Sequence, residues 1–330
     1  MTVKDLDRAR SDRNGAIEAF ARRHRFRPLE AVPWVAALAA AFVFPGYLPL
    51  GAQILATILF VMSADLVVGY AGIVTLGHAA FFGTGAYTAG ILAAHGWGEP
   101  LSGLVAAAAV SALIGFLSGL VILRTTGLAL LMQTLVVAAM LLETANKASS
   151  ITGGDDGLQG VDVWPIFGVF HFDMFGRVAY GYCLGVLLVG WLVTRQIVHS
   201  PFGRSLTGMR ENVRRMHAIG APVFRRRLVV YTISAALAGV SGGLIAQTTQ
   251  FVGLTSLSLE RSGNALIMLT IGGVGRLYGA FIGVPLYMIA QDQFAEIEPV
   301  YWYFWIGLLM VAVVMFARGG IIGLVERFRR

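Results

Sequence analysis

The chain has 330 residues, of which 57% are hydrophobic and only 13% are charged, and its formal net charge is +7. Soluble domains carry about 25% charged residues, so this composition excludes an ordinary water-soluble domain. A nucleic-acid-binding role is disfavoured, because the basic residues lie in short runs between apolar segments. The single cysteine, Cys183, excludes a disulfide framework or a cysteine metal cluster within one chain. We therefore predict a membrane protein with no metal site.

Residues 1–30 precede the first apolar segment and mix eight basic residues with five acids. Such a segment can form a helix on the inner membrane surface or remain a disordered basic tail, and the sequence leaves both interpretations open.

Ten apolar segments follow, and a membrane span needs about 20 mostly apolar residues. The stretch 259–291 is too long for one span and is interrupted by Gly272-Gly273-Val274-Gly275-Arg276, so we expect two short or oblique segments there. The other eight lie near 32–50, 51–70, 73–94, 101–123, 127–145, 177–197, 228–250 and 299–317. The pattern predicts an all-α integral membrane protein with about ten transmembrane or half-spanning helices.

The connecting segments predict how the chain is oriented. With both termini in the cytoplasm, all but three of the 25 Lys and Arg residues lie in cytoplasmic segments, and the acids collect outside. This is the asymmetry that the positive-inside rule requires. We therefore expect a basic cytoplasmic segment at 1–30, one transmembrane domain at 31–318 with a cytoplasmic loop at 198–227, and a basic cytoplasmic tail at 319–330.

Asp65 lies inside the second apolar segment. An acid at the membrane centre costs about 2.5–3.5 kcal/mol on insertion scales, so we expect it to face a polar partner or a watery cavity unless it lies near the interface. His78 is interpreted as a hydrogen-bond partner between helices, since a lone membrane histidine is more often that than a proton carrier.

The segment 69–87 is rich in glycine and hydroxylated residues. Within it and just beyond, Ala79, Gly83, Ala86 and Gly90 form one small helix face that suits close packing. Glycines at 69, 72 and 77 predict a helix break whose backbone groups face protein or water instead of lipid. The segment either lines a solute path or forms a tightly packed helix pair without solute contact.

The loop 198–227 contains a second distinctive pattern. Ser200-Pro201-Phe202-Gly203-Arg204 predicts a turn, and a helix over 205–220 should follow, ending at Gly220 with Pro222 just beyond. A helix between two spans can bind a cytosolic partner, or it can contact anionic lipid. The chain has no G-x-x-x-x-G-K-[ST] phosphate loop, so ATP hydrolysis of that kind would require another polypeptide.

Several motifs occur in a characteristic order. They are Gly69-Tyr70-Ala71-Gly72, the run from Leu76 to Gly83, Gly85-Ala86-Tyr87, Arg124, Gly127, Thr134-Leu135, Thr152-Gly153-Gly154 with Gly157-Leu158, the run from Ser200 to Arg204, Arg210-Glu211-Asn212, Ala218, Gly220, Ser234-Ala235, Leu237-Ala238-Gly239, and Gly272 to Gly275 with Gly279 and Gly283. This ordered set resembles the LivM-type permeases of branched-chain amino-acid importers. Asp65 departs from the family, which usually has asparagine there.

The resemblance implies a channel-forming permease of an ATP-driven (ABC) importer in the bacterial inner membrane, with no catalytic residues and no cofactor of its own. Its expected partners are membrane lipid, a second LivH-like permease, two cytosolic ATPases that bind ATP-Mg, and a periplasmic solute-binding protein. Its expected solutes are branched-chain amino acids or related amino-acid-like compounds.

Three groups of residues receive roles from the residue patterns and the resemblance together. The candidate path residues are Asp65, Gly69, Gly72, Thr75, Gly77, His78, Gly83 and Thr134. The ATPase-coupling residues are Arg204, Arg210, Glu211, Asn212, Ala218 and Gly220. The binding-protein contacts are Thr152, Gly153, Gly154 and Gly157.

Three alternatives remain. One is a purely structural membrane scaffold, which would not explain the distinctive 198–227 loop. The chain could be an ion-coupled secondary transporter with Asp65 as the coupling carboxylate. It could also be a membrane enzyme that uses His78 and Asp65 as acid and base, which is less favoured because no cluster of titratable groups supports a reaction.

Overall fold

Helices account for all ten predicted apolar segments in the computed structural model, which describes residues 28–166, 168, 170, 173, 176–299, 301–316 and 319–323. The helices are α2 (Val32–Val43), α3 (Leu48–Asp65), α4 (His78–Ala94), α5 (Pro100–Ile122), α6 (Leu128–Lys147), α8 (Arg177–His199), α11 (Val223–Thr249), α12 (Leu259–Gly272), α13 (Gly279–Ile297) and α14 (Trp302–Phe316). The all-α prediction is confirmed for the part of the chain that the structure describes.

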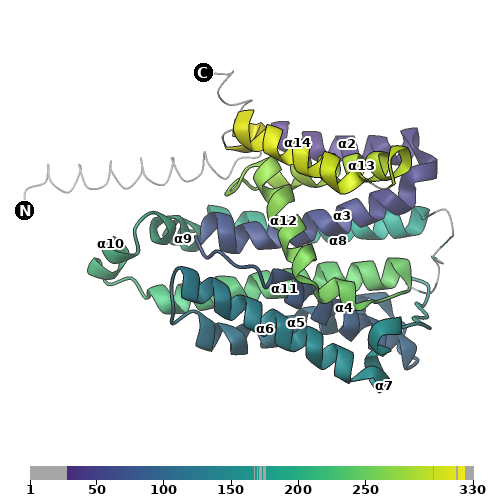
Figure 1. The fold of residues 1–330 in the computed structure, drawn as a ribbon, viewed down its shortest axis with the longest axis horizontal. Helices are drawn as coiled ribbons and strands as arrows, with labels where there is room; N and C mark the ends of the chain where they lie inside the picture. Colours follow the sequence, from purple (N-terminus) through teal and green to yellow (C-terminus); the bar gives the residue numbers. More distant parts are fainter. Residues whose placement is uncertain are drawn as a thin grey trace, which may run out of the picture.

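Five segments in these residues are long and apolar enough to cross a membrane: α5, α6, α8, α11, and α3 together with its flanking turns. Helix α12 differs from them. Its 14 residues span about 21 Å, less than the roughly 30 Å of a bilayer core, and it crosses the long helices steeply (Figure 1). This agrees with the short, oblique segment expected there. The total of ten spanning or half-spanning helices stays a prediction.

The helices form layers (Figure 1). Helices α2, α13 and α14 lie on one side, α3 and α8 lie in the middle, and α4, α5, α6 and α11 lie on the other side. Helix α12 runs across these layers. The central helix is α11, which packs against α5, α4 and α3, and it is buried along much of its length.

Helices α4 and α11 approach closely because glycines replace larger side chains where they cross. A Cβ atom on Gly85 would overlap the backbone of Gly239, and one on Gly242 would overlap the carbonyl of Phe82. Of the predicted small face, Ala86 lies at this crossing. Gly83 and Gly90 instead face other segments of the chain. Helix α4 is buried on almost every side, so its small residues do not mark a single packing face.

Replacing Gly242 by valine is expected to lower the stability of the detergent-solubilised protein by about 1–3 kcal/mol, because the added methyl groups must push α4 and α11 apart. The matched control is Gly181→Val in α8, where an added Cβ would meet no heavy atom within 4 Å. Thermal unfolding of the two variants measures the difference. Equal stability would show that α4 and α11 are not in close contact.

Both ends of the described chain lie at the same end of the molecule as the 198–227 loop (Figure 1). Glu30 forms an ion pair with Arg195, just before that loop. Near the other end of the chain, Arg276 Nη1 donates a hydrogen bond to the carbonyl of Gly319 at 3.4 Å. The placement of these ends on one side agrees with the predicted topology, and the side that faces the cytoplasm stays a prediction. Residues 1–27 and 324–330, and with them most of the predicted N-terminal segment and tail, lie outside the described residues.

Candidate functional site

The 198–227 loop folds into two short helices, and not into a turn followed by one helix. Helix α9 (Pro201–Glu211) begins directly after Ser200, whose Oγ accepts a hydrogen bond from the N–H of Gly203 at 3.2 Å. The prediction of a turn over Ser200–Arg204 was therefore wrong. Proline suits the first position of a helix, where its missing N–H is not needed, and here it starts α9.

The predicted single helix over 205–220 was wrong as well, because Asn212 divides it. Asn212 is extended (φ −156°, ψ 100°), and its side chain accepts a hydrogen bond from the N–H of Arg215 at 2.9 Å. It thus caps a second helix, α10 (Val213–Ala218), which is the role that asparagine favours at a helix start. The predicted stop at Gly220 is confirmed, since this residue adopts φ +75° just after α10.

Residues 211–220, which we call the docking tip, project from the end of the molecule (Figure 1). Four of the predicted coupling residues lie exposed on it: Glu211, Asn212, Ala218 and Gly220. The tip is basic, with Arg214 and Arg215 exposed, and it also carries an apolar side chain, Ile219, that is 71% exposed. Of the two remaining coupling residues, Arg204 is exposed on α9. The structure therefore brings Glu211, Asn212, Ala218 and Gly220 to one protruding surface.

Arg210, the last predicted coupling residue, points back toward the membrane helices. Its Nη1 donates a hydrogen bond to the carbonyl of Gly69, in the turn that follows α3. Its backbone also lies against Gly72, where an added Cβ would come within 3.1 Å of the Arg210 Cα. Arg210 thus joins α9 to the glycine-containing break.

The predicted break in the glycine-rich segment is confirmed. After α3 the chain forms one π-helical turn, η3 (Leu66–Tyr70), and then runs without helix until α4 begins at His78. The protein itself satisfies backbone groups here. The N–H of Ile73 donates to the carbonyl of Val67 at 2.9 Å, and the N–H of Leu76 donates to Oγ1 of Thr134 at 3.4 Å. Non-helical backbone at membrane depth requires such partners.

The candidate path residues lie mostly inside the chain. Seven of the eight are buried, and Gly72 is exposed. Gly77 packs so closely on Thr134 that a Cβ would overlap the threonine carbonyl. The hydroxyl of Thr75, which is 1% exposed, accepts a hydrogen bond from the N–H of Gly77 at 3.2 Å. Within one chain these contacts match the tightly packed alternative, and a path-lining role stays a prediction.

Asp65 and His78 have different partners. Asp65 is 3% exposed, and its Oδ1 accepts a hydrogen bond from the N–H of Gly275 at 2.7 Å, which supplies the expected polar partner. His78 Nε2 is hydrogen-bonded to Ser63 Oγ at 2.9 Å, and its ring stacks on Phe60 with 5.5 Å between ring centroids. His78 therefore links α4 to α3, as the sequence favoured.

The predicted binding-protein contacts form a tight turn at the opposite end of the molecule. Thr152 donates its hydroxyl to the carbonyl of Ala145 at 2.6 Å, and Gly153, Gly154 and Gly157 all have positive φ, between +57° and +78°. These residues shape the turn and do not project from it, since Thr152, Gly154 and Gly157 are buried. The exposed side chains on the turn are Asp155 and Asp156, which the sequence marked only as external acids.

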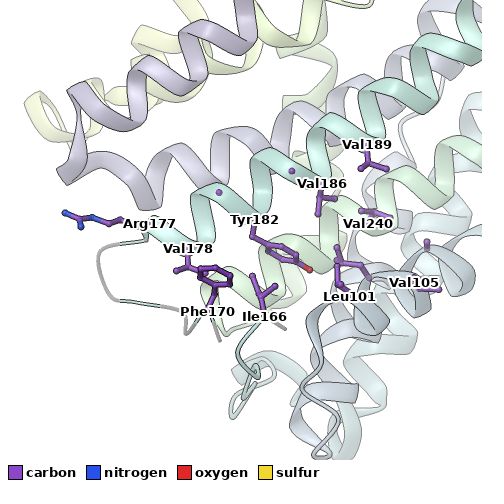
Figure 2. Close-up of a pocket in the computed structure, with 14 residues that line it drawn as sticks. Leu101, Val105, Ile166, Phe170, Arg177, Val178, Tyr182, Val186, Val189 and Val240 are labelled. Carbon is purple, nitrogen blue, oxygen red and sulfur yellow. The ribbon is translucent and has the colours of Figure 1, made fainter. Parts of the chain in front are cut away.

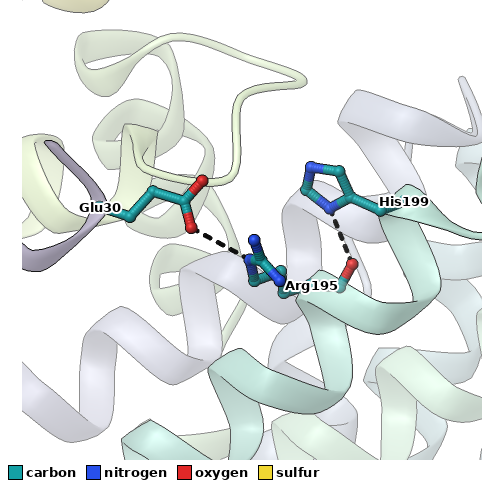
Figure 3. Close-up of polar contacts among 3 residues, drawn as sticks. All are labelled: Glu30, Arg195 and His199. Carbon is teal, nitrogen blue, oxygen red and sulfur yellow. Dashed lines mark hydrogen bonds and ion pairs between the residues drawn. The ribbon is translucent and has the colours of Figure 1, made fainter. Parts of the chain in front are cut away.

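An ion pair that the sequence did not reveal lies beside the 198–227 loop (Figure 3). Arg195 Nε and Glu30 Oε2 are 3.1 Å apart, and their side chains are 9% and 14% exposed. The guanidinium also lies over the ring of Trp191, 5.8 Å from its centroid. One helical turn further along, His199 Nδ1 is hydrogen-bonded to the carbonyl of Arg195 at 2.9 Å. The pair ties the start of the described chain to α8.

An apolar groove of about 800 Å³ lies between α5 and α8 (Figure 2). Aliphatic side chains such as Val105, Val186 and Val189 line it. Its one phenol, that of Tyr182, donates a hydrogen bond to Oε1 of Gln247 at 2.8 Å. Arg177 is also among the lining residues, but most of the surface is apolar and suits hydrocarbon better than a polar solute. Among the described residues, no group of three or more His, Cys, Asp or Glu side chains could hold a metal ion.

Comparison with known proteins gives one family match and several relatives. The family described as "Branched-chain amino acid transport system / permease component" matches residues 48–314. The high-affinity branched-chain amino acid transport system permease protein LivM of Escherichia coli K12 is 28% identical, over 87% of this chain and 74% of its own length. A probable LivM of Methanocaldococcus jannaschii is 23% identical, over 66% of this chain and 68% of its own length. The autoinducer 2 import system permease protein LsrC of Klebsiella pneumoniae is 30% identical, over 53% of this chain and 50% of its own length. No solved structure matches.

Proposed function

Because this chain belongs to the branched-chain amino acid transport system permease family, we propose that it is the permease subunit of an ATP-driven importer in the bacterial inner membrane. Its proposed solutes are branched-chain amino acids or related amino-acid-like compounds. The relatives' names include both branched-chain amino acid and autoinducer 2 import systems. The amino-acid proposal rests on the LivM relatives, which share more of the chain.

The docking tip carries the proposal of ATP-driven transport. It presents exposed arginines around one exposed isoleucine, Ile219, and it stands clear of the membrane helices. An apolar side chain surrounded by charge is the usual composition of a small protein-binding surface. Each of two cytosolic ATPases would hold ATP-Mg, and one of them would receive this tip. Closure of the ATPases would then move α9 and α10.

A second, LivH-like permease would pack against α6. This helix is the least buried of the five candidate spans, and one of its faces carries exposed side chains at every fourth position. These are Leu128, Met132, Val136 and Met140, which are 77%, 58%, 58% and 64% exposed. The stripe lies on the helix that contributes Thr134, so the solute path would run between the two permeases. The buried candidate path residues would lie inside this chain and hold the helices that form that interface.

A periplasmic solute-binding protein would contact the opposite end of the molecule. The turn containing Thr152, Gly153, Gly154 and Gly157 is held to α6 by the hydrogen bond from the Thr152 hydroxyl to the carbonyl of Ala145 at 2.6 Å. It offers two carboxylates, Asp155 and Asp156, to a partner. A basic patch on the binding protein would complement them.

Ion-coupled transport through Asp65 is less well supported. The carboxylate is buried and already accepts a backbone hydrogen bond from Gly275. A coupling ion would have to compete with that contact in every cycle. The structure gives His78 a partner other than Asp65, which also weakens an acid–base role for the pair.

Purification of the tagged chain from its native membrane in mild detergent tests the proposal. Mass spectrometry of the accompanying proteins should identify an ATPase with a phosphate-binding loop and a second permease. The control is the same purification after deletion of the docking tip, which should lower the amount of ATPase recovered relative to the second permease. A chain that purifies alone, and transports alone in liposomes, would contradict the proposal.

A further inference from the structure

We propose that five residues, Asp65, Gly69, Gly72, Arg210 and Gly275, form a rigid junction that carries motion of the docking tip to the turn between α12 and α13. Asp65 is the positioning residue of this junction. The inference rests on the proposed function, and it assigns to Asp65 a mechanical role in place of ion coupling.

The first contact joins α3 to the α12–α13 turn. Asp65 Oδ1 accepts the N–H of Gly275 at 2.7 Å, although the two residues are 210 positions apart in the chain. Removing one partner of a buried hydrogen bond leaves the other unsatisfied, which costs more than the bond itself contributes. A buried carboxylate is costly where packing alone is needed, and an aliphatic side chain would pack at lower cost. The contact is therefore better explained by the position that it fixes.

The second contact joins α9 to the turn after α3. Arg210 donates to the carbonyl of Gly69, and Gly69 lies one helical turn beyond Asp65. An added Cβ on Gly69 would overlap both the Asp65 carboxylate and the backbone nitrogen of Gly275. An added Cβ on Gly275 would approach the guanidinium of Arg210. The glycines at 69 and 275 thus leave room only for the Asp65 and Arg210 side chains that join the three segments.

The junction joins the buried helix α3 to two segments that can adjust. These are the π-helical turn after α3 and the glycine-containing turn between α12 and α13. Asp65 ends the largely buried helix α3. The chain leaves α3 through a π-helical turn, a feature frequent at functional sites. The turn that Asp65 holds has positive φ at Gly273 and Gly275, +117° and +76°. Glycine turns of this kind can change conformation at little steric cost. A shift of Arg210 would therefore be passed, through Gly69 and Asp65, to the start of α13.

This arrangement makes Asp65 a residue that affects coupling without touching solute or nucleotide. The Asp65→Ala variant removes the acceptor for Gly275, whereas Asp65→Asn keeps a side-chain oxygen at the same place. In liposomes containing the complete importer, Asp65→Ala should raise the ATP hydrolysed per solute imported by about tenfold, because the buried N–H of Gly275 is left without its acceptor. Asp65→Asn should remain within about twofold of the unmodified complex, since a neutral acceptor retains most of the contact.

Arg210→Ala tests the junction by itself if Asp65→Ala assembles poorly, and where both variants assemble, a double-mutant cycle tests it further. Arg210→Ala alone should raise the same ratio, and adding Asp65→Ala should raise it little further, because both act through one junction. The control pair combines Asp65→Ala with Glu211→Ala, whose side chain is exposed on the tip. Those two effects should add.

Four outcomes decide the matter. An Asp65→Ala complex with an unchanged ratio, or effects of Asp65 and Arg210 that simply add, would overturn the junction. Loss of all uptake in Asp65→Asn would also overturn it and would restore the ion-coupled role of the carboxylate. An unmodified complex whose uptake does not need ATP would instead refute the proposed function, whatever the variants do.

Discussion

Gly220→Pro is expected to reduce ATP-driven uptake by at least about tenfold, through strain of 1–3 kcal/mol at the end of α10. Gly220 has φ +75°, and proline is fixed near −65°. Proline would also remove the N–H that Gly220 donates to the carbonyl of His217 at 3.0 Å. The residue is exposed and an added Cβ would meet no heavy atom within 4 Å, so the membrane helices should be unaffected. Uptake by the reconstituted complex and retention of the ATPase on purification measure the effect.

The control for this prediction is Gly220→Asn. Asparagine adopts left-handed backbone conformations more readily than other non-glycine residues. It should therefore keep near-normal uptake and ATPase retention. If Gly220→Pro transported and bound its ATPase as well as Gly220→Asn did, the end of α10 would have no part in coupling.

Glu30→Ala is expected to lower the stability of the solubilised protein by about 3 kcal/mol, because removing one partner of a buried ion pair leaves the other charge buried. Arg195 is 7% exposed, and it faces Glu30 at 3.1 Å (Figure 3). The loss should be visible as a lower midpoint of thermal unfolding. It should also loosen the start of α2 from α8, which protease accessibility near residue 30 would report.

Two further variants show whether burial is the cause. Glu143→Ala breaks an exposed pair with Lys147 at 3.4 Å, and should cost no more than about 0.5 kcal/mol. The double variant Glu30→Leu with Arg195→Met should recover most of the stability lost in Glu30→Ala, because two apolar side chains can replace a buried pair. A loss in Glu30→Ala no larger than that in Glu143→Ala would show that the pair is not a stabilising contact.

Hydropathy was sufficient to locate the membrane helices, because the bilayer requires long apolar segments and the chain supplies them at regular intervals. Glycines at particular positions were also informative, because glycine adopts left-handed backbone conformations that other residues avoid. Gly220 marked the end of a helix, and the glycines between 69 and 77 marked the break before α4. In each case the local sequence alone imposes the backbone conformation.

Residues with two roles misled the sequence analysis. Proline at position 201 suits both a turn and the first turn of a helix, and here it starts α9. Asn212 was placed inside a helix, although its stronger tendency is to cap the next one. The small face of α4 could not be assigned to one neighbour, because glycines on several sides of the helix meet different segments.

Contacts between distant residues lay beyond local patterns altogether. Asp65 and Gly275 are 210 positions apart, and Arg210 and Gly69 are 141 apart. No periodicity connects such residues. The sequence could show that Asp65 needs a polar partner, which the structure supplies, but it could not show that the partner is a backbone N–H in the turn between α12 and α13. The sequence likewise could not show that Glu30 pairs with Arg195, because Glu30 looked like the last residue of the basic N-terminal segment.

The central claim is that ATP hydrolysed by separate subunits drives solute through this permease. Uptake of labelled leucine into liposomes tests it most directly, with this chain, its second permease, the ATPases and the binding protein present and ATP enclosed on the ATPase side. We expect uptake that requires the enclosed ATP and is unchanged by a protonophore. Uptake by the chain alone, indifferent to ATP and abolished by the protonophore, would contradict it.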